Sequence, residues 1–120
     1  MLVQFSIILG LLRSTILLYY TPLSNNSILA TTHYDATGDV YNSFYIEFNS
    51  NKAWSTASNG ESGKFDVESV AAHEFGHGLG LGHSIALYAT MFESTAAGEI
   101  SKRSLHKDDI YGIKSIYRGL

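Results

Sequence analysis

Cysteine is absent from the 120 residues of this chain, so disulfide bonds are excluded and cysteine usage does not indicate a cellular compartment. Clusters of lysine and arginine are also absent, and the formal net charge is −3. Such a chain offers no basic surface to the phosphates of nucleic acid or to an anionic membrane, and we expect neither as a partner. The sequence also shows no internal repeats.

The residues that are present favour a small globular protein. Apolar side chains make up 45% of the sequence, which includes eight tyrosines and six phenylalanines. A chain of this length can form one small domain with a modest hydrophobic core. We expect that domain to be a monomer.

Residues 73–83 read HEFGHGLGLGH and contain three of the five histidines. On a helix, His73 and His77 lie one turn apart, with a rotation of about 40° and a rise of about 6 Å. Both imidazoles then face the same side of the helix, and neutral imidazole is a good zinc ligand. The spacing therefore predicts that the two histidines share one metal ion.

A catalytic zinc site needs a third protein ligand and a fourth position for water, and His83 is the natural third ligand. It could not reach the metal from a continuous helix, because it would lie about 9 Å from His77 along the axis. Gly80 can adopt the left-handed conformation that ends a helix and reverses the chain, and Gly82 gives the following residues similar freedom. Glu74 lies beside His73 near the predicted metal, where its carboxylate suits a general base and acid.

Residues 73–83 resemble the HExxHxxGxxH signature of the metzincin metallopeptidases, and Ser84 makes the segment similar to the matrixin branch. The resemblance implies an α+β, metzincin-like fold, with a small antiparallel or mixed sheet, an active-site helix and a C-terminal helix. It implies a zinc-dependent endopeptidase with one catalytic zinc ion and a protein or peptide substrate. It also implies a secreted or extracellular location.

Met91 lies eight residues after His83, where a metzincin has the methionine of its Met-turn. By resemblance, its side chain forms an apolar floor beneath the zinc ligands. Matrixins usually continue with tyrosine and proline, whereas this chain has Phe92 and Glu93. That segment forms a wall of a substrate pocket in the family, so the substrate preference stays open.

Two helices are expected around these residues. Asp66 is a suitable N-cap for a helix from about Val67 to Leu79. Residues 105–117 have a helical apolar stripe and resemble the C-terminal matrixin helix. Asp108 and Asp109 suit its first turn on dipole grounds, and the resemblance makes them structural supports that tie the helix to the Met-turn. His106 is expected to be exposed to solvent.

Residues 28–34 and 41–49 are rich in β-branched and aromatic side chains and flank a turn-like segment, so they predict a β-hairpin. In the second strand, Phe44, Ile46 and Phe48 alternate with polar residues and Tyr45, which predicts one buried face. By resemblance, the edge strand that pairs with substrate contains Leu29, Ala30, Thr31 and Thr32. Trp54, in a polar loop, is expected to pack against the zinc helix.

Residues 1–20 are the most apolar segment and allow three interpretations: a secretory signal, a membrane anchor, or a helix packed on the sheet. A signal lacks its usual basic start here, and an anchor would place Arg13 near the middle of the bilayer at a cost of about 2.5 to 3.5 kcal/mol. A membrane is expected as a partner only if this segment is an anchor. Residues 21–27 are interpreted as a linker, and residues 28–120 as the metallopeptidase domain.

Two further metal sites receive little support. His33 and Asp35 have the His-x-Asp spacing of a structural zinc site, but no histidine lies between His33 and His73 to complete it, so His33 is interpreted as a surface residue. Asp35 and Asp39 could hold a weakly bound calcium ion, although two carboxylates do not make a recognisable calcium loop.

Three alternatives to the peptidase remain at this stage, of which one is a membrane-anchored fragment without zinc, in which residues 1–20 partition into lipid and the histidines have no role. The strands that precede the edge strand in a matrixin have no obvious counterpart here, which leaves a truncated, catalytically silent domain that binds zinc or peptide. A purely structural helix with incidental histidines is disfavoured, because glycines at 76, 78, 80 and 82 would each cost up to about 1 kcal/mol in a helix interior.

Overall fold

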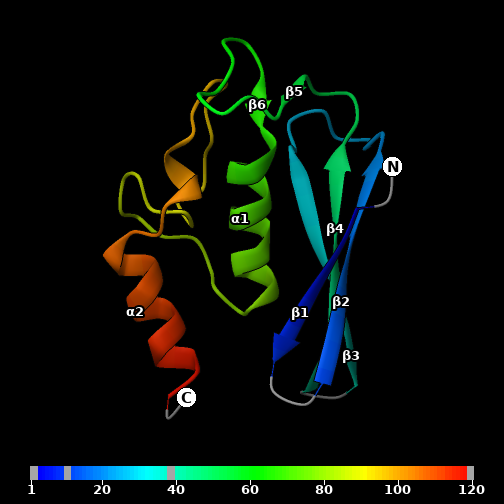
Figure 1. The fold of residues 1–120 in the computed structure, drawn as a ribbon, viewed down its shortest axis with the longest axis vertical. Coiled ribbons are helices and arrows are strands. Elements are labelled where there is room, and N and C mark those ends of the chain that lie inside the picture. Colours follow the sequence, from blue (N-terminus) through cyan, green and yellow to red (C-terminus); the bar gives the residue numbers. More distant parts are fainter. Residues whose placement is uncertain (1–2, 10–11, 38–39, 119–120) are drawn as a thin grey trace. The chain divides into compact units, whose positions relative to one another are not determined.

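The computed structural model describes residues 3–9, 12–37 and 40–118. The chain divides into two compact units, Met1–Asn51 and Lys52–Leu120, which are described here one after the other. In the described residues, the first unit holds a four-stranded sheet, and the second holds two α-helices, a short 3-10 helix and a two-stranded sheet. Figure 1 shows these elements, and they confirm the predicted α+β class.

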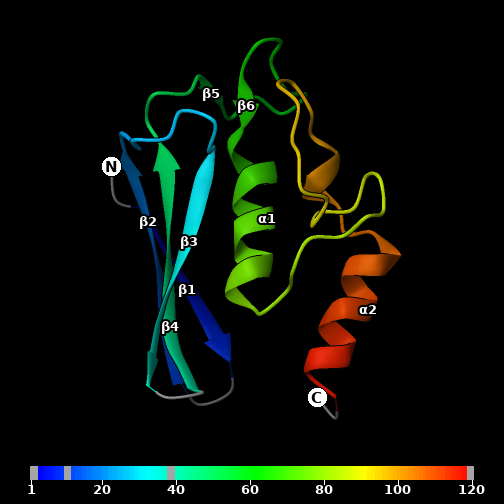
Figure 2. The same cartoon turned by 180° about the vertical axis from the view of Figure 1, so that it is seen from behind.

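The sheet of the first unit mixes antiparallel and parallel pairing. Its strands are β1 (Val3–Leu9), β2 (Leu12–Thr21), β3 (Ala30–Thr37) and β4 (Val40–Asn49), in the order β1-β2-β4-β3. The β1–β2 and β3–β4 pairs are antiparallel hairpins, and β2 runs parallel to β4 between them. Figure 2 shows the same four strands from behind.

The period of two along these strands separates a buried face from a more polar one. Ile46 pairs with Leu18 across the parallel ladder, and both are buried together with Ile16 and Phe48. Tyr19 and Tyr45 lie on the opposite face and meet edge to face, with ring centroids 5.4 Å apart. Buried and exposed side chains therefore alternate along β4, as predicted for the second strand of the hairpin, and they also alternate along β2.

The hairpin predicted for residues 28–34 and 41–49 is confirmed as β3 and β4, with a register shift between Asp35 and Ala36. Its turn residues Gly38 and Asp39 lie outside the described residues, and so does half of the suggested calcium site.

The N-terminal segment corrects one expectation. Where a packed helix was one interpretation of residues 1–20, the structure has strands β1 and β2, so two strands precede β3 in the same sheet. The two strands pair in register from Val3↔Leu18 to Leu9↔Leu12, which satisfies the backbone hydrogen bonds of both apolar runs. The apolar residues of this segment do not recur with the period of a helix. Among the described residues, no helix is long and apolar enough to cross a bilayer.

Asn49, the last residue of β4, holds the segment that was interpreted as a linker. Its fully buried side chain accepts hydrogen bonds from the backbone N–H of Leu23 (3.2 Å) and Asn51 (3.1 Å) and donates one to the carbonyl of Ile28 (2.9 Å). The connection from β2 to β3 is therefore tied to the end of the sheet. By alternation with Phe48, Asn49 would instead belong to the polar face.

The second unit begins with a short parallel ladder. Strands β5 (Trp54–Ser55) and β6 (Phe65–Asp66) pair in register. The ring of Trp54, expected to pack against the zinc helix, contacts Phe65, with ring centroids 6.1 Å apart. The ladder thus leads directly into the helix that follows Asp66.

Helix α1 (Val67–Gly78) confirms the predicted N-cap. The Asp66 carboxylate accepts a hydrogen bond from the backbone N–H of Ser69 at 2.9 Å. It also receives two bonds from Arg103, from Nε (2.8 Å) and Nη2 (2.6 Å). Arg103 belongs to the 3-10 helix η1 (Ser101–Arg103), so this pair fastens η1 to the start of α1.

The end of α1 also agrees with the sequence. Leu79 is the C-cap, and Gly80 follows with φ of +98°, a conformation in which a side chain would be strained. The backbone N–H of Leu81 then bonds the carbonyl of Gly76 at 2.9 Å, which turns the chain away from the helix axis.

Helix α2 (Lys107–Ile116) is the predicted C-terminal helix, and its N-cap is His106. The His106 imidazole accepts from the backbone N–H of Asp108 at 3.1 Å, while the Asp109 carboxylate accepts from the N–H of His106 at 2.8 Å. His106 is half-buried and caps the start of the helix, whereas the sequence predicted a residue exposed to solvent.

The Asp66–Arg103 pair predicts how stability depends on pH. Hydrogen bonds from Arg103 lower the pKa of Asp66 below its ordinary 3.8. A lowered pKa in the folded state stabilises the protein above the unfolded value, and that stabilisation disappears as the pH falls through the folded value. Arg103→Met should therefore lower the thermal midpoint by about 5 °C at pH 7. In urea unfolding, the difference from the unchanged protein should shrink below about pH 3.8.

Lys64→Met is the matched control, because Lys64 pairs with Glu61 on the surface, where both side chains are 44% exposed. Exposed pairs contribute little, so this variant should unfold like the unchanged protein at every pH. A difference for Arg103→Met that does not change between pH 3 and 7 would contradict the assigned role of the pair.

Candidate metal centre

Three imidazoles converge at the end of α1. His73 and His77 come from successive turns of the helix, and His83 returns to them after the reversal at Gly80. The Nε2 atom of His77 lies 3.1 Å from Nε2 of His73 and 3.2 Å from Nε2 of His83. The three histidines form a group that could hold a metal ion, with one ligand atom of each within 4.8 Å of the others.

The other ring nitrogens fix the tautomers of two of these histidines. Nδ1 of His73 lies 2.8 Å from the carbonyl oxygen of Thr90, and Nδ1 of His77 lies 2.8 Å from that of Leu81. A carbonyl oxygen only accepts, so each Nδ1 must carry the proton and donate it. In the neutral ring, Nε2 then presents its lone pair toward the other histidines, which is the arrangement of a metal-binding imidazole.

The donor set fits zinc. Two Nε2 acceptors that face each other at 3.1 Å repel unless a cation lies between them. Tetrahedral zinc with Zn–N bonds of about 2.0 to 2.1 Å has its ligand nitrogens roughly 3.3 Å apart, close to the separations seen here. The spacing therefore suits a zinc ion.

The three histidines differ in their exposure to solvent. His73 is buried, His77 is half-buried and His83 is exposed, so the group opens toward solvent on the side of His83. Burial lowers the pKa of His73 to about 4, with a smaller opposing effect from its bond to Thr90. His73 therefore stays neutral near pH 7 and is ready to act as a ligand.

Glu74 follows His73 on α1 and is also buried, with 8% of its surface exposed. It is therefore an acidic side chain in the same helical turn as the first histidine.

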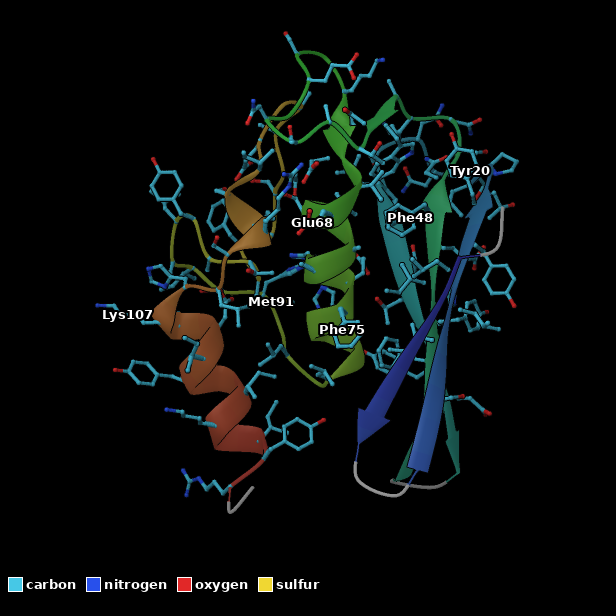
Figure 3. The ribbon with its side chains drawn as sticks, viewed as in Figure 1. Tyr20, Phe48, Glu68, Phe75, Met91 and Lys107 are labelled. Carbon is cyan, nitrogen blue, oxygen red and sulfur yellow. The ribbon has the colours of Figure 1, made fainter. Side chains whose placement is uncertain are left out.

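Met91 lies against the same helix. Its side chain is 2% exposed, and its sulfur occupies the space that a Cβ atom on Gly76 would take. Figure 3 shows Met91 beside α1. Gly76, which lies between His73 and His77 in the sequence, thus allows the close approach of the methionine to the helix.

Asp109 fixes the backbone around Met91. Its carboxylate accepts from the N–H of Thr90 (2.9 Å) and of Met91 (3.0 Å), in addition to the bond from His106. Met91 in turn accepts a bond on its carbonyl from the N–H of Ser84 at 2.8 Å. One buried carboxylate therefore links the start of α2, Met91 and the residue after His83.

Asp108 has a different environment from Asp109. It is exposed and accepts a hydrogen bond from the Ser84 hydroxyl. Both residues line a cavity of about 360 Å³ together with His83, Ser84 and Tyr111. The two neighbouring aspartates thus contact opposite ends of the segment from His83 to Met91.

The remaining predicted site residues belong to the first unit. Ala30 and Thr31 begin β3, Leu29 precedes them, and β3 is an edge strand of the described sheet. His33 lies within β3 and is half-buried, where it is paired with Glu47 (Nε2 to Oε1, 2.6 Å) and stacked on Tyr45 with ring centroids 4.7 Å apart.

Sequence reasoning missed Thr90, whose carbonyl bonds His73, and the buried Lys102. Thr90 contributes through its backbone carbonyl, which any residue type would supply. Lys102 is 1% exposed, although an isolated lysine in a polar segment is usually a solvated residue. Neither residue carried a signal in the sequence that could have identified it.

The chain is similar to known metalloproteinases. The Matrixin family model matches residues 23–118. Matrix metalloproteinase-27 from Tupaia belangeri is 54% identical over 56 residues, which cover 47% of this chain and 11% of that protein. Metalloendoproteinase 5-MMP from Arabidopsis thaliana is 54% identical over 54 residues (45% and 15%), and neutrophil collagenase from Homo sapiens 43% over 70 residues (58% and 14%). The matched part is thus a small fraction of each relative's length.

The contact between Gly76 and Met91 predicts a coupled pair of substitutions. Gly76→Ala should gain up to about 1 kcal/mol of helix propensity but lose about 1 to 3 kcal/mol, because the methionine must leave its position. Met91→Ala alone should destabilise through the lost packing. In the double variant, the loss should be smaller than the sum of the two, as measured by urea unfolding.

Gly63→Ala is a useful comparison, because a Cβ atom at Gly63 meets no neighbour within 4 Å although its φ is +76°. Its cost should come from the backbone alone and add to that of Met91→Ala. Additive losses for Gly76 and Met91 would show that the contact does not constrain the methionine.

Proposed function

Because the chain belongs to the matrixin family, we propose that it acts as a zinc-dependent endopeptidase. In this proposal, His73, His77 and His83 hold one catalytic zinc ion, and Glu74 is the general base and acid. The observation that carries it is the convergence of three Nε2 atoms, with His77 3.1 and 3.2 Å from its two partners. The carbonyls that hold Nδ1 of His73 and His77 support it further.

Zinc bound to this group supplies Lewis acidity to a substrate carbonyl and to a water molecule. The Glu74 carboxylate would take a proton from the attacking water as its oxygen forms a bond to the carbonyl carbon. It would pass this proton to the leaving amine nitrogen as the C–N bond breaks. Water is thus divided between the two products, and Glu74 returns to its ionised form.

Met91, Asp108 and Asp109 are assigned supporting roles. Met91 provides an apolar surface against α1. Asp109 holds the backbone of Thr90 and Met91, and Asp108 holds the Ser84 hydroxyl. We propose that the two aspartates position the segment that carries His83 and that neither takes part in the chemistry.

The proposed substrate is a protein or peptide in extended conformation. Its backbone would pair with β3, where Leu29, Ala30 and Thr31 lie, and the edge position of β3 in its sheet supports this assignment. We further propose that the protein works as a secreted monomer. No observation on the described residues favours a calcium ion at Asp35.

The test replaces Glu74 with glutamine and measures two quantities in the purified chain. Zinc content, by atomic absorption, should stay near one per chain because the histidines are intact. Cleavage of casein, which a chelator should abolish in the unchanged protein, should fall about 10² to 10⁴-fold because the proton carrier is lost. His77→Ala should lose the zinc and the cleavage together.

Glu68→Gln is the matched control, since Glu68 lies in the first turn of α1 and its side chain is 69% exposed (Figure 3). This variant should cleave at the unchanged rate. Full activity in Glu74→Gln would exclude the proposed mechanism. Zinc without any cleavage in the unchanged chain would instead indicate a silent zinc-binding domain.

A further inference from the structure

Lys102 is a buried cation that the proposed chemistry does not use. It lies in η1, and only 1% of its surface is exposed. Its ammonium group donates to the carbonyl oxygens of Phe92 and, at 3.3 Å, Thr90. It also lies 5.7 Å from the centre of the Phe92 ring.

Burying an ammonium group is costly, and an apolar side chain would fill the same volume without that cost. Burial lowers the pKa of Lys102, and the carboxylates of Glu99 and Asp109 oppose that effect. The ammonium therefore has counter-charges nearby and two carbonyls as direct partners. Its hydrogen bonds are the feature that an apolar residue could not supply.

Those bonds lead directly to the metal centre. The Thr90 carbonyl that accepts from Lys102 is the one that accepts from Nδ1 of His73 at 2.8 Å. Thr90 also returns a bond, because its hydroxyl donates to the carbonyl of Lys102 at 3.0 Å. Lys102 and Thr90 thus bond each other in both directions, and His73 bonds the same Thr90 carbonyl that accepts from Lys102.

We propose that Lys102 is a positioning residue for the metal centre. It holds the carbonyls of Thr90 and Phe92 so that the Thr90 carbonyl keeps His73 protonated on Nδ1, with the Nε2 lone pair facing His77. The inference rests on the proposed function in so far as it assigns zinc to the three histidines. The orientation of His73 itself does not require the metal.

The alternative is that Lys102 only stabilises the fold. Arg103 provides the matched control, because it is the next residue of η1 and also makes several hydrogen bonds, but to Asp66, Ala57 and Ser58. Arg103→Met should destabilise the unit without disturbing the segment from Thr90 to Phe92. Lys102→Met should both destabilise the unit and disturb that segment.

The first measurement uses the metal-free protein and the ¹⁵N shifts of its imidazoles in long-range ¹H–¹⁵N NMR spectra. At neutral pH and below the unfolding transition of each variant, His73 should be almost entirely the Nδ1–H tautomer in the unchanged chain and in Arg103→Met. In Lys102→Met, the two tautomers should mix, because the Thr90 carbonyl is no longer held. In Lys102→Gln, whose side chain is smaller and uncharged, the tautomer populations of His73 should shift in the same direction. This variant replaces Lys102→Met if Lys102→Met does not fold.

The second measurement is zinc affinity, by competition with a chromogenic chelator at a temperature where every metal-free variant is folded. Loss of a group that orients a ligand typically weakens metal binding about 10 to 100-fold, and we expect this range for Lys102→Met. Arg103→Met should stay within about twofold of the unchanged chain. The visible absorption bands of the cobalt(II) form should also change in Lys102→Met alone.

Each outcome distinguishes the two hypotheses. An unchanged His73 tautomer in a folded Lys102 variant overturns the positioning role, whatever the metal does. Equal losses of zinc affinity in the Lys102 and Arg103 variants reduce Lys102 to a stabilising residue. If the unchanged chain binds no zinc, the proposed function fails, and the tautomer measurement still decides the role of Lys102.

Discussion

The metal centre depends on one kind of interaction, the hydrogen bond from an imidazole Nδ1 to a backbone carbonyl. His73 donates to Thr90 and His77 to Leu81, both at 2.8 Å, and these bonds determine which ring nitrogen keeps its lone pair. Without them, each ring could rotate or exchange tautomers, and the Nε2 atoms would not converge. The structure beyond α1 can be understood as the means of holding those two carbonyls: Gly80 turns the chain so that Leu81 meets His77, and Asp109 holds the backbone at Thr90.

The second unit achieves this with little hydrophobic core. Its buried apolar residues among those described are Val70, Ala89 and Met91, whereas its buried polar and charged residues are more numerous. They include Asp66, Ser69, His73, Glu74, Thr90, Lys102 and Asp109. Such networks are stable when every member is satisfied, and no described buried side-chain nitrogen or oxygen is left without a partner. A metal ion shared by three histidines adds stability to a unit of this kind, since the energy of binding is also energy of folding.

Features set by nearby residues could be predicted from the sequence, and features set by distant residues could not. The histidine spacing, Asp66 as N-cap, the break at Gly80 and the β3–β4 hairpin all follow from local patterns, and the structure has each of them. The pairing of β2 with β4 joins strands that are separated in the sequence by β3, so no local pattern specified it. Lys102 and Arg103 look alike in the sequence, yet one points to the segment of Thr90 and Phe92 and the other to Asp66.

The residues that predict the chemistry are therefore different from the residues that orient the ligands. Residues 73–83 form a short motif, from which the proposed zinc ligands and the proposed reaction can be predicted. The orientation of His73 depends on residues 17 to 36 positions later, which act through backbone atoms of Thr90 and carry no motif of their own. A substitution at Asp109 or Lys102 could therefore leave the motif intact while the ligands lose their alignment. Thr90 is the point at which the fold controls the metal centre, because its N–H donates to Asp109 while its carbonyl accepts from both Lys102 and His73.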